Sequence, residues 1–192
     1  MIELKKDILE QYPKELKRHL FKHNAVLVTA DTIITQNYYI ESGVLKCYAY
    51  NEELKRDTIF CLLSAGDAIL SSNNTPYKIP APFDIQVIKD AVIYSISNDD
   101  LKNLRKKEPI FDKFVQSNSQ QMINKLIEIA KINTYINIID SYKKLLEIYP
   151  FLDTIIDKDV AAILGADRRT ITRTKLKLNG RPKRTKSQKP KE

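Results

Sequence analysis

The chain has 192 residues, 43% of them hydrophobic and 29% charged, and a formal net charge of +8. A chain of this length can bury one substantial core and a smaller second one, so we expect one or two domains. No run approaches the roughly 18 apolar residues of a membrane span, and the charged N-terminus MIELKKDILEQYPKELKRHL is unlike a signal sequence, which predicts a cytoplasmic protein without a membrane partner.

Residues 1 to 24 have the apolar spacing of short helices, with hydrophobic side chains three or four positions apart. On such a helix the two histidines, His19 and His23, would lie one turn apart and could face one metal ion. No third ligand is evident, so we interpret both as partly exposed helix residues and predict no metal site. The apolar positions are Ile2, Ile8, Leu9, Leu16, Leu20 and Phe21.

From Ala25 to Ile96 the chain consists of short runs rich in β-branched and aromatic residues, among them TIIT, NYYIE, VLKCYAY, DIQVI and AVIYSI. This pattern predicts a compact β-roll or barrel of about eight strands. Cys47 and Cys61 are too few for a disulfide framework or a four-cysteine iron-sulfur cluster, so we expect buried free thiols, with redox sensing as the alternative. A cupin-type metalloenzyme would need histidines on these strands, and residues 25 to 97 contain none.

Helical patterning returns after Ser97. Asn98 is expected to cap the short helix DDLKNLRKK, and Pro109 to open a longer helix of about 25 residues. The longer helix has more apolar surface than a small roll can cover, which predicts pairing with its copy in a second subunit. Packing wholly against its own chain is the alternative. The expected dimer-interface positions are Val115, Met122, Leu126 and Ile129.

The segment DVAAILGADRRTITRTKLKL, from Asp159 to Leu178, predicts two short helices joined by a tight turn. Asp157 is expected to cap the first helix, Gly165 to end it in a left-handed turn, and Asp167 to cap the second. Ile171 should point into a small core while arginines near the start of the second helix face outward. This is the layout of a helix-turn-helix, whose second helix enters the major groove of DNA.

Arginine can pair bidentately with guanine, and threonine can reach a phosphate or a thymine methyl group. Twelve Lys and Arg against four Asp and Glu from Asp157 onward give this end an excess equal to the whole-chain charge of +8, as expected for a polyanion partner. The expected DNA-binding residues are Arg168, Arg169, Thr170, Thr172, Arg173, Lys175 and Lys177.

These motifs resemble, in order along nearly the whole chain, the Crp/Fnr family of bacterial transcription regulators. YYIESGVLKCYAYNEELKRDTIFCLLSAGD resembles the family's β-roll, with Gly43 and Gly66 at turn positions, and the helix from Pro109 resembles its dimerisation helix. SYKKLLEIYPFLDTIIDKDVAAILGADRRTITR is similar to one branch of the family ahead of and through the helix-turn-helix. The resemblance implies a homodimer on a two-fold symmetric operator in double-stranded DNA, and it raises RNA polymerase as a further partner.

The same resemblance places Arg168, Arg169 and Arg173 at base-reading positions. Arg169 stands where the family commonly has a glutamate. We therefore do not expect this protein to recognise the DNA half-site sequence that is usual for the family. Thr174 stands where an apolar residue is expected, and the residues after Leu178 lack the strand pattern of a full wing.

The ligand cassette departs from the family pattern. Members that bind cyclic AMP follow a Gly-Asp turn with a Gly-Glu pair and then an Arg-Ser pair, whereas Gly66-Asp67 is followed here by AILSSNNTPYKIPAPFDIQVI. A buried phosphate without its arginine would be an uncompensated charge, so we do not expect cyclic AMP to be the effector. No haem ligand set is evident, and no cofactor is predicted. An unknown small-molecule effector is expected near Gly66, Asp67, Ser71, Ser72 and Lys78.

The sequence therefore predicts an α+β protein. Residues 1–135 would form a double-stranded β-roll sensor domain with a dimerisation helix at about 109–135, and residues 136–192 a helix-turn-helix domain with a reduced wing and a basic tail. The predicted function is a homodimeric, sequence-specific transcription regulator and not an enzyme, since no G-x-S-x-G, P-loop or dinucleotide fingerprint is present. The alternative is a ligand-binding or protein-interaction module that its basic C-terminus tethers non-specifically to nucleic acid or acidic partners.

Overall fold

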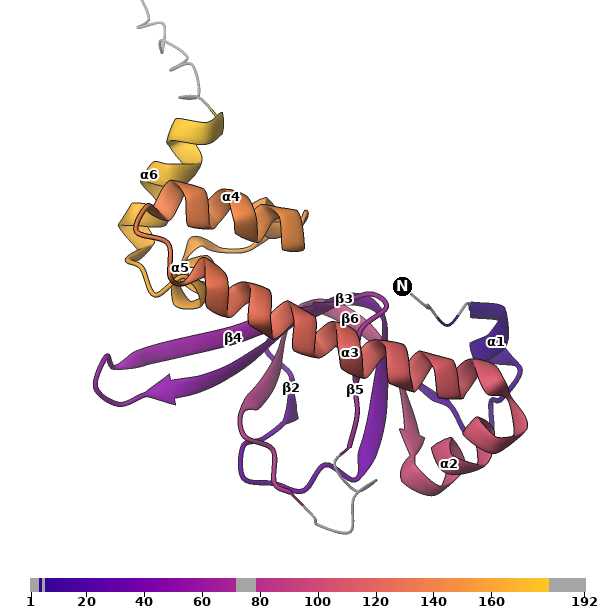
Figure 1. The fold of residues 1–192 in the computed structure, drawn as a ribbon. Helices are drawn as coiled ribbons and strands as arrows, with labels where there is room; N and C mark the ends of the chain where they lie inside the picture. The colour runs from indigo at the N-terminus through magenta and orange to yellow at the C-terminus, as the bar shows by residue number, and fades with distance from the viewer. Residues whose placement is uncertain (1–3, 5, 72–78, 180–192) are drawn as a thin grey trace, which may run out of the picture. The chain divides into compact units, whose positions relative to one another are not determined.

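The computed structural model describes residues 4, 6–71 and 79–179 (Figure 1). Ser72 and Lys78 of the predicted effector site, Ile2, and the basic tail with any wing lie outside the described residues. The chain divides into two compact units, Met1–Lys131 and Ile132–Glu192. No helix in the described part is both long enough and apolar enough to span a bilayer.

The first unit is built on an antiparallel six-stranded sheet. Strands β1, β6, β3 and β4 follow one another in that order, while β2 pairs with β6 and β5 pairs with β3. Helices precede and follow the sheet along the chain, so the predicted α+β class is confirmed. The strands are β1 Lys17–Phe21, β2 Val26–Val28, β3 Gln36–Asn51, β4 Arg56–Ser64, β5 Ala68–Ile69 and β6 Asp84–Ser97.

The described residues hold six strands where the sequence predicts about eight, because runs expected as separate strands are continuous. NYYIE and VLKCYAY both belong to β3, DIQVI and AVIYSI both belong to β6, and TIIT is not a strand. The β3–β6 register shifts on both sides of Gly43, which has a φ of 99°. A Cβ at Gly43 would lie 2.5 Å from the Cα of Ala91, so this bulge requires glycine both for its conformation and for space.

The helix predicted in the second half of residues 1–24 is wrong. Among the described residues up to 24, the α-helix is limited to α1, Lys6–Glu10, and the second half contains β1, which pairs with β6. His19 therefore lies on a strand, where its Nε2 is 2.9 Å from the Oγ of Ser95, and His23 lies in the turn that follows β1. The two histidines do not share a helix face.

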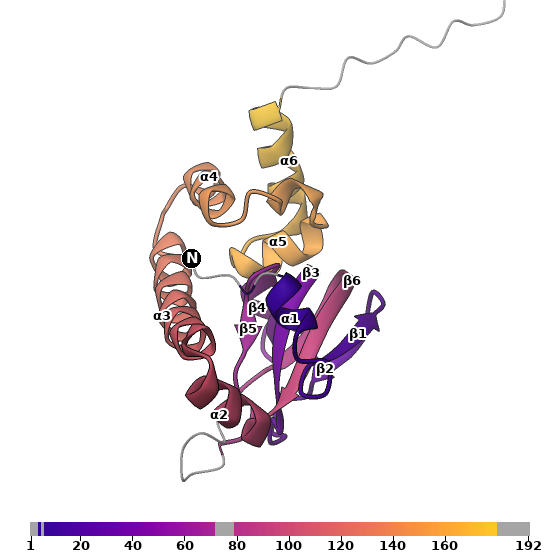
Figure 2. The same cartoon turned by 90° about the vertical axis from the view of Figure 1, so that its right-hand side faces the viewer.

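Two further helices pack with α1 on the sheet. In α2, Asn98–Lys107, the N-cap is Ser97 and not the predicted Asn98, because the Oγ of Ser97 accepts a hydrogen bond from the backbone N of Asp100 at 3.1 Å. Helix α3, Pro109–Ile132, begins where the sequence predicts and runs beside β4 and β5 (Figure 2). The core between these helices and the sheet includes Leu9, Tyr39, Tyr94, Ile96, Leu101, Leu104, Phe111, Phe114 and Val115.

The second unit is helical over its described residues. Helix α4, Ile138–Ile148, is followed by a short 3-10 helix, then by α5, Asp157–Ile163, and α6, Arg168–Asn179. Each helix contributes side chains that are almost completely shielded from solvent, so three short helices share one small core. These side chains are Tyr142, Leu145, Tyr149, Leu152, Val160 and Ile171.

Candidate nucleic-acid interface

The turn between α5 and α6 has the geometry that the sequence predicts. Gly165 adopts the left-handed conformation, with a φ of 61°, and the backbone N of Ala166 donates to the carbonyl of Ala161 at 3.0 Å. Ala161 and Ile171 are both buried, which places a small side chain where the two helices approach each other. Thr174, which stands where the family has an apolar residue, is also buried. This position is therefore buried here although its side chain carries a hydroxyl group.

The opposite face of α6 carries exposed positive charge. Arg168, Arg169 and Arg173 are exposed, and none of their guanidinium groups forms a hydrogen bond or an ion pair with another residue in the described part of the chain. Arg169 and Arg173 are one turn apart and share a face, which Lys177 continues. All three arginines lie in the first half of a 12-residue helix, where its unpaired N–H groups also favour an anion.

Asp157 joins α5 to α6 instead of capping α5. The N-cap position of α5 is Ile156, which has no side-chain cap, and Asp157 is the first helical residue. The carboxylate of Asp157 accepts a hydrogen bond from the hydroxyl of Thr172 and lies 2.8 Å from the Nζ of Lys175. Lys175 also donates to the carbonyl of Ile155 at 3.1 Å. Thr172 and Lys175, both expected to contact DNA, are therefore held within the helix pair.

These contacts change the acidity of Asp157. Its partial burial acts to raise the pKa, but the hydrogen bonds from Lys175 and Thr172, with the charge of Lys175, outweigh that effect and hold the pKa below its ordinary value. The carboxylate therefore stays charged, and the pair that orients α6 stays intact, at neutral pH.

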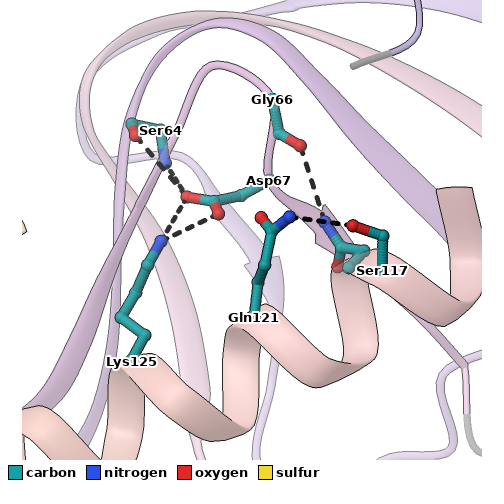
Figure 3. A network of polar contacts seen from close by, with 7 residues as sticks. Ser64, Gly66, Asp67, Ser117, Gln121 and Lys125 are labelled. Carbon is teal, nitrogen blue, oxygen red and sulfur yellow. Dashed lines mark hydrogen bonds and ion pairs between the residues drawn. The ribbon is translucent and has the colours of Figure 1, made fainter. Parts of the chain in front are cut away.

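The predicted effector residues Gly66 and Asp67 lie in the turn between β4 and β5 (Figure 3). Asp67 is only 5% exposed. Both of its carboxylate oxygens are 2.8 Å from the Nζ of Lys125 in α3, and Oδ2 accepts a hydrogen bond from the backbone N of Ser64. The carboxylate is thus neutralised within the protein, and it ties the turn to α3.

Ser71 belongs to a separate network. Its backbone N donates to the Oδ1 of Asn37 and its hydroxyl to the Oδ1 of Asn98, both at 2.9 Å, while the amide of Asn37 donates to the same oxygen of Asn98 at 2.7 Å. Asp67 and Ser71 therefore take part in two internal networks and do not form one open polar site.

No family model matches this sequence, and no curated protein matches it. Solved structures do match: a cyclic nucleotide-binding domain-containing protein from Listeria monocytogenes has a TM-score of 0.72 at 13% identity, covering 90% of this chain and 87% of that one. The c-di-GMP-responsive regulator CLP of Xanthomonas campestris has a TM-score of 0.67 at 13% identity over 89% of this chain and 90% of its own. A protein from Eubacterium rectale, described as a Crp/Fnr-family transcriptional regulator, has a TM-score of 0.66 at 16% identity over 92% and 85%.

The chain has the Crp/Fnr fold. The resemblance read from the sequence is confirmed at the level of fold, over nearly the whole chain. Because every one of these identities is below 20%, the likeness does not transfer a function, which has to be argued from the residues of the site.

Within this Crp/Fnr fold, α3 exposes different positions from those predicted for a dimer interface. Val115 is only 8% exposed and belongs to the core, and Ile129 is 4% exposed, while Met122 and Leu126 are half-buried. The large exposed hydrophobic side chains of α3 are Ile123 and Ile127, which are 52% and 48% exposed.

Sequence reasoning missed an apolar cavity of about 240 Å³ in the first unit. Its wall includes Cys47 and Cys61, which are buried free thiols, as predicted, and lie directly opposite each other on β3 and β4. The hydrogen bond between them raises the pKa of Cys47 and lowers that of Cys61. Met122 and Leu126 of α3 also line the cavity. No sequence signal marks such a space, because apolar side chains that line a cavity follow the same pattern as those that fill a core.

Proposed function

We propose that the protein is a sequence-specific transcription regulator that binds double-stranded DNA through α6, and not an enzyme. The observation that carries this proposal is the exposed group Arg168, Arg169 and Arg173. Its guanidinium groups form no hydrogen bond or ion pair among the described residues, and it stands on a helix whose other face is buried through Ile171. A guanidinium group on a rigid helix suits bidentate pairing with guanine edges. That some solved structures with this fold are described as transcriptional regulators supports the proposal.

The seven predicted DNA-binding residues would then have three roles. Arg168, Arg169 and Arg173 would contact base edges. Thr170 and Lys177 would contact the sugar-phosphate backbone of the DNA. Thr172 and Lys175 would fix the orientation of α6 through Asp157, because any phosphate contact they made would compete with that carboxylate.

The proposed regulator is a homodimer on a two-fold symmetric operator, with residues 1–135 as sensor domain and 136–192 as DNA-binding domain. The exposed side of α3 supports pairing, because its residues are spaced alternately by four and three positions, as in a coiled-coil seam. RNA polymerase is a further proposed partner, on the sequence resemblance alone. The residues of this seam are Gln116, Gln120, Ile123, Ile127 and Ala130.

Cyclic AMP is not the proposed effector. Asp67 is already paired with Lys125, and no arginine occurs between Gly66 and Ile88 to neutralise a cyclic phosphate. The regulator would therefore respond to a different class of molecule.

The test is a titration of single-alanine variants on an operator selected from genomic fragments and on a scrambled duplex. The wild type should prefer the operator by roughly 10³ or more. Arg169→Ala and Arg173→Ala should each cost about 1–3 kcal/mol on the operator and little on the scrambled duplex. Lys143→Ala, which removes an exposed charge from α4, is the matched control and should change neither affinity appreciably.

If both arginine variants lose the same affinity for both duplexes, α6 does not read sequence. The protein is then better described as a binding module that its basic end tethers to nucleic acid.

A further inference from the structure

The cavity beside α3 has an almost wholly apolar wall. Among the described residues of this wall, the only side chains that can donate a hydrogen bond are Cys47 and Cys61, whose thiols are weak donors and already bond to each other. A buried water needs two to four polar partners, which this wall does not provide. An apolar cavity of this kind therefore binds an apolar molecule more favourably than it binds water.

As far as the structure describes them, the surroundings of the cavity carry no unbalanced charge that would suit an ionic ligand. The ion pair nearest to it along α3 joins Lys125 to both carboxylate oxygens of Asp67. Entering beside this pair, a phosphate or carboxylate would lose its hydration without gaining a free cation among the described residues. The described lining therefore favours uncharged molecules over charged ones.

Size and access narrow the ligand class further. An apolar cavity of on the order of 150 Å³ in another protein holds one benzene molecule, so a volume of about 240 Å³ has room for a fused two-ring molecule. Ile79, at the edge of the cavity, is 55% exposed, and its neighbour Pro80 is exposed as well. An apolar edge of this kind gives an uncharged molecule a route inward.

We propose that this cavity binds a small, uncharged, apolar molecule, which lies between the cysteine pair of the sheet and Met122 and Leu126 of α3. Binding in the cavity does not depend on the proposed function. Only the role of the bound molecule as the effector of the regulator rests on it. The link is α3 itself: Met122 and Leu126 face the cavity, while Ile123 and Ile127, each one residue further on, belong to the exposed seam. Occupancy of the cavity acts on the helix that carries the dimer contacts.

The test uses the full-length protein without DNA, so that its result is independent of the regulator function. Calorimetric titration with indole should give saturable heat with one site per chain, and cyclic AMP and cyclic GMP should give none. Leu126→Trp, which fills the cavity from a half-buried helix position, should weaken indole binding by about tenfold or more. Ile123→Trp makes the same change at an exposed position of the same helix and should leave the affinity unchanged.

A second measurement keeps the test valid if Leu126→Trp does not fold. The chain contains only two cysteines, and both line the cavity. Saturating indole should therefore slow their modification by methyl methanethiosulfonate, a small uncharged thiol reagent, in the wild-type protein. Absence of both saturable heat and thiol protection overturns the proposal, and so does equal indole affinity in a folded Leu126→Trp variant. Loss of operator binding would bear only on the proposed function.

Discussion

At the scale of single residues, two carboxylates have similar structural roles in the two units. Asp67 joins the β4–β5 turn to α3 through Lys125, and Asp157 joins α5 to α6 through Lys175. Each pair is largely shielded from solvent, and each carboxylate also accepts a hydrogen bond from a second residue. Removing one partner of such a pair leaves the other charge buried without compensation. A single substitution should therefore lower the free energy of unfolding by more than the intact pair contributes to it.

Asp157→Asn should therefore destabilise the protein at neutral pH. We expect a loss of about 1–2 kcal/mol in the free energy of unfolding, measured by urea titration with circular dichroism at pH 7. The control is Asp140→Asn, an exposed carboxylate of α4 without an ion pair in the described part of the chain, which should change stability by less than about 0.5 kcal/mol.

The pH dependence of this difference follows from the lowered pKa of Asp157. Its folded-state pKa lies below the unfolded value of about 3.9, so its contribution is complete above that pH and is lost as the pH falls through the folded-state pKa. The stability gap between wild type and Asp157→Asn should narrow below about pH 4 and close under more acidic conditions. A gap that stays constant from neutral to acidic pH contradicts this assignment.

At the scale of elements, the sequence predicts best where a feature is local. Pro109 at the start of α3 and Gly165 at the end of α5 are each set by backbone preferences of one or two residues. By contrast, β1 has four exposed residues out of five, so its sequence shows no alternation, and its pairing with β6 joins residues more than 65 positions apart. Non-local pairing of this kind leaves no local signal.

The candidate site follows the same rule. The exposure of the arginines of α6 could be predicted, because the helix has a clear inner face that is marked by Ile171. Asp67 could be predicted as a turn residue, but not as the partner of Lys125, which is 58 residues away. Among the described residues of the predicted effector site, Asp67 and Ser71 belong to separate networks for this reason, since their hydrogen-bond partners come from distant elements.

The exposed seam of α3 leads to a prediction about assembly. Ile123→Glu combined with Ile127→Glu should convert a dimer to a monomer, because two buried glutamates in each subunit would face their copies across the seam. Sedimentation should report half the mass of the wild type at micromolar concentration, and operator affinity should fall with it. The control, Asn103→Glu combined with Asn133→Glu, adds the same two charges at exposed positions outside α3. A wild-type protein that is itself monomeric, yet binds its operator tightly, is the contrary result.

At the scale of the whole molecule, the charge is unevenly divided. Residues 1–156 contain equal numbers of basic and acidic side chains, so the excess of +8 lies entirely in residues 157–192. Part of this excess is on α6 and part is in the sequence that follows it. Charge on a folded helix can hold a fixed register against base edges, whereas sequence-independent attraction to phosphates needs only proximity and releases counterions.

Deleting Arg181 to Glu192 should therefore lower the affinity for operator and scrambled duplexes by the same factor and leave their ratio unchanged. The deletion removes six basic residues and one acidic residue. The slope of log affinity against log salt should flatten by about 0.9 for each phosphate contact that is lost. Titrations of both duplexes over a range of salt concentrations measure the ratio and the slope together.

Two tail variants separate charge from sequence in this test. A chain with residues 181–192 in shuffled order keeps every charge and should match the wild type in affinity and salt slope, because counterion release depends on charge and not on order. A chain with the six basic residues of this segment changed to glutamine should behave like the deletion. If the shuffled tail lowers the operator affinity alone, the tail reads bases, and the division between a sequence-reading helix and a phosphate-binding tail is wrong.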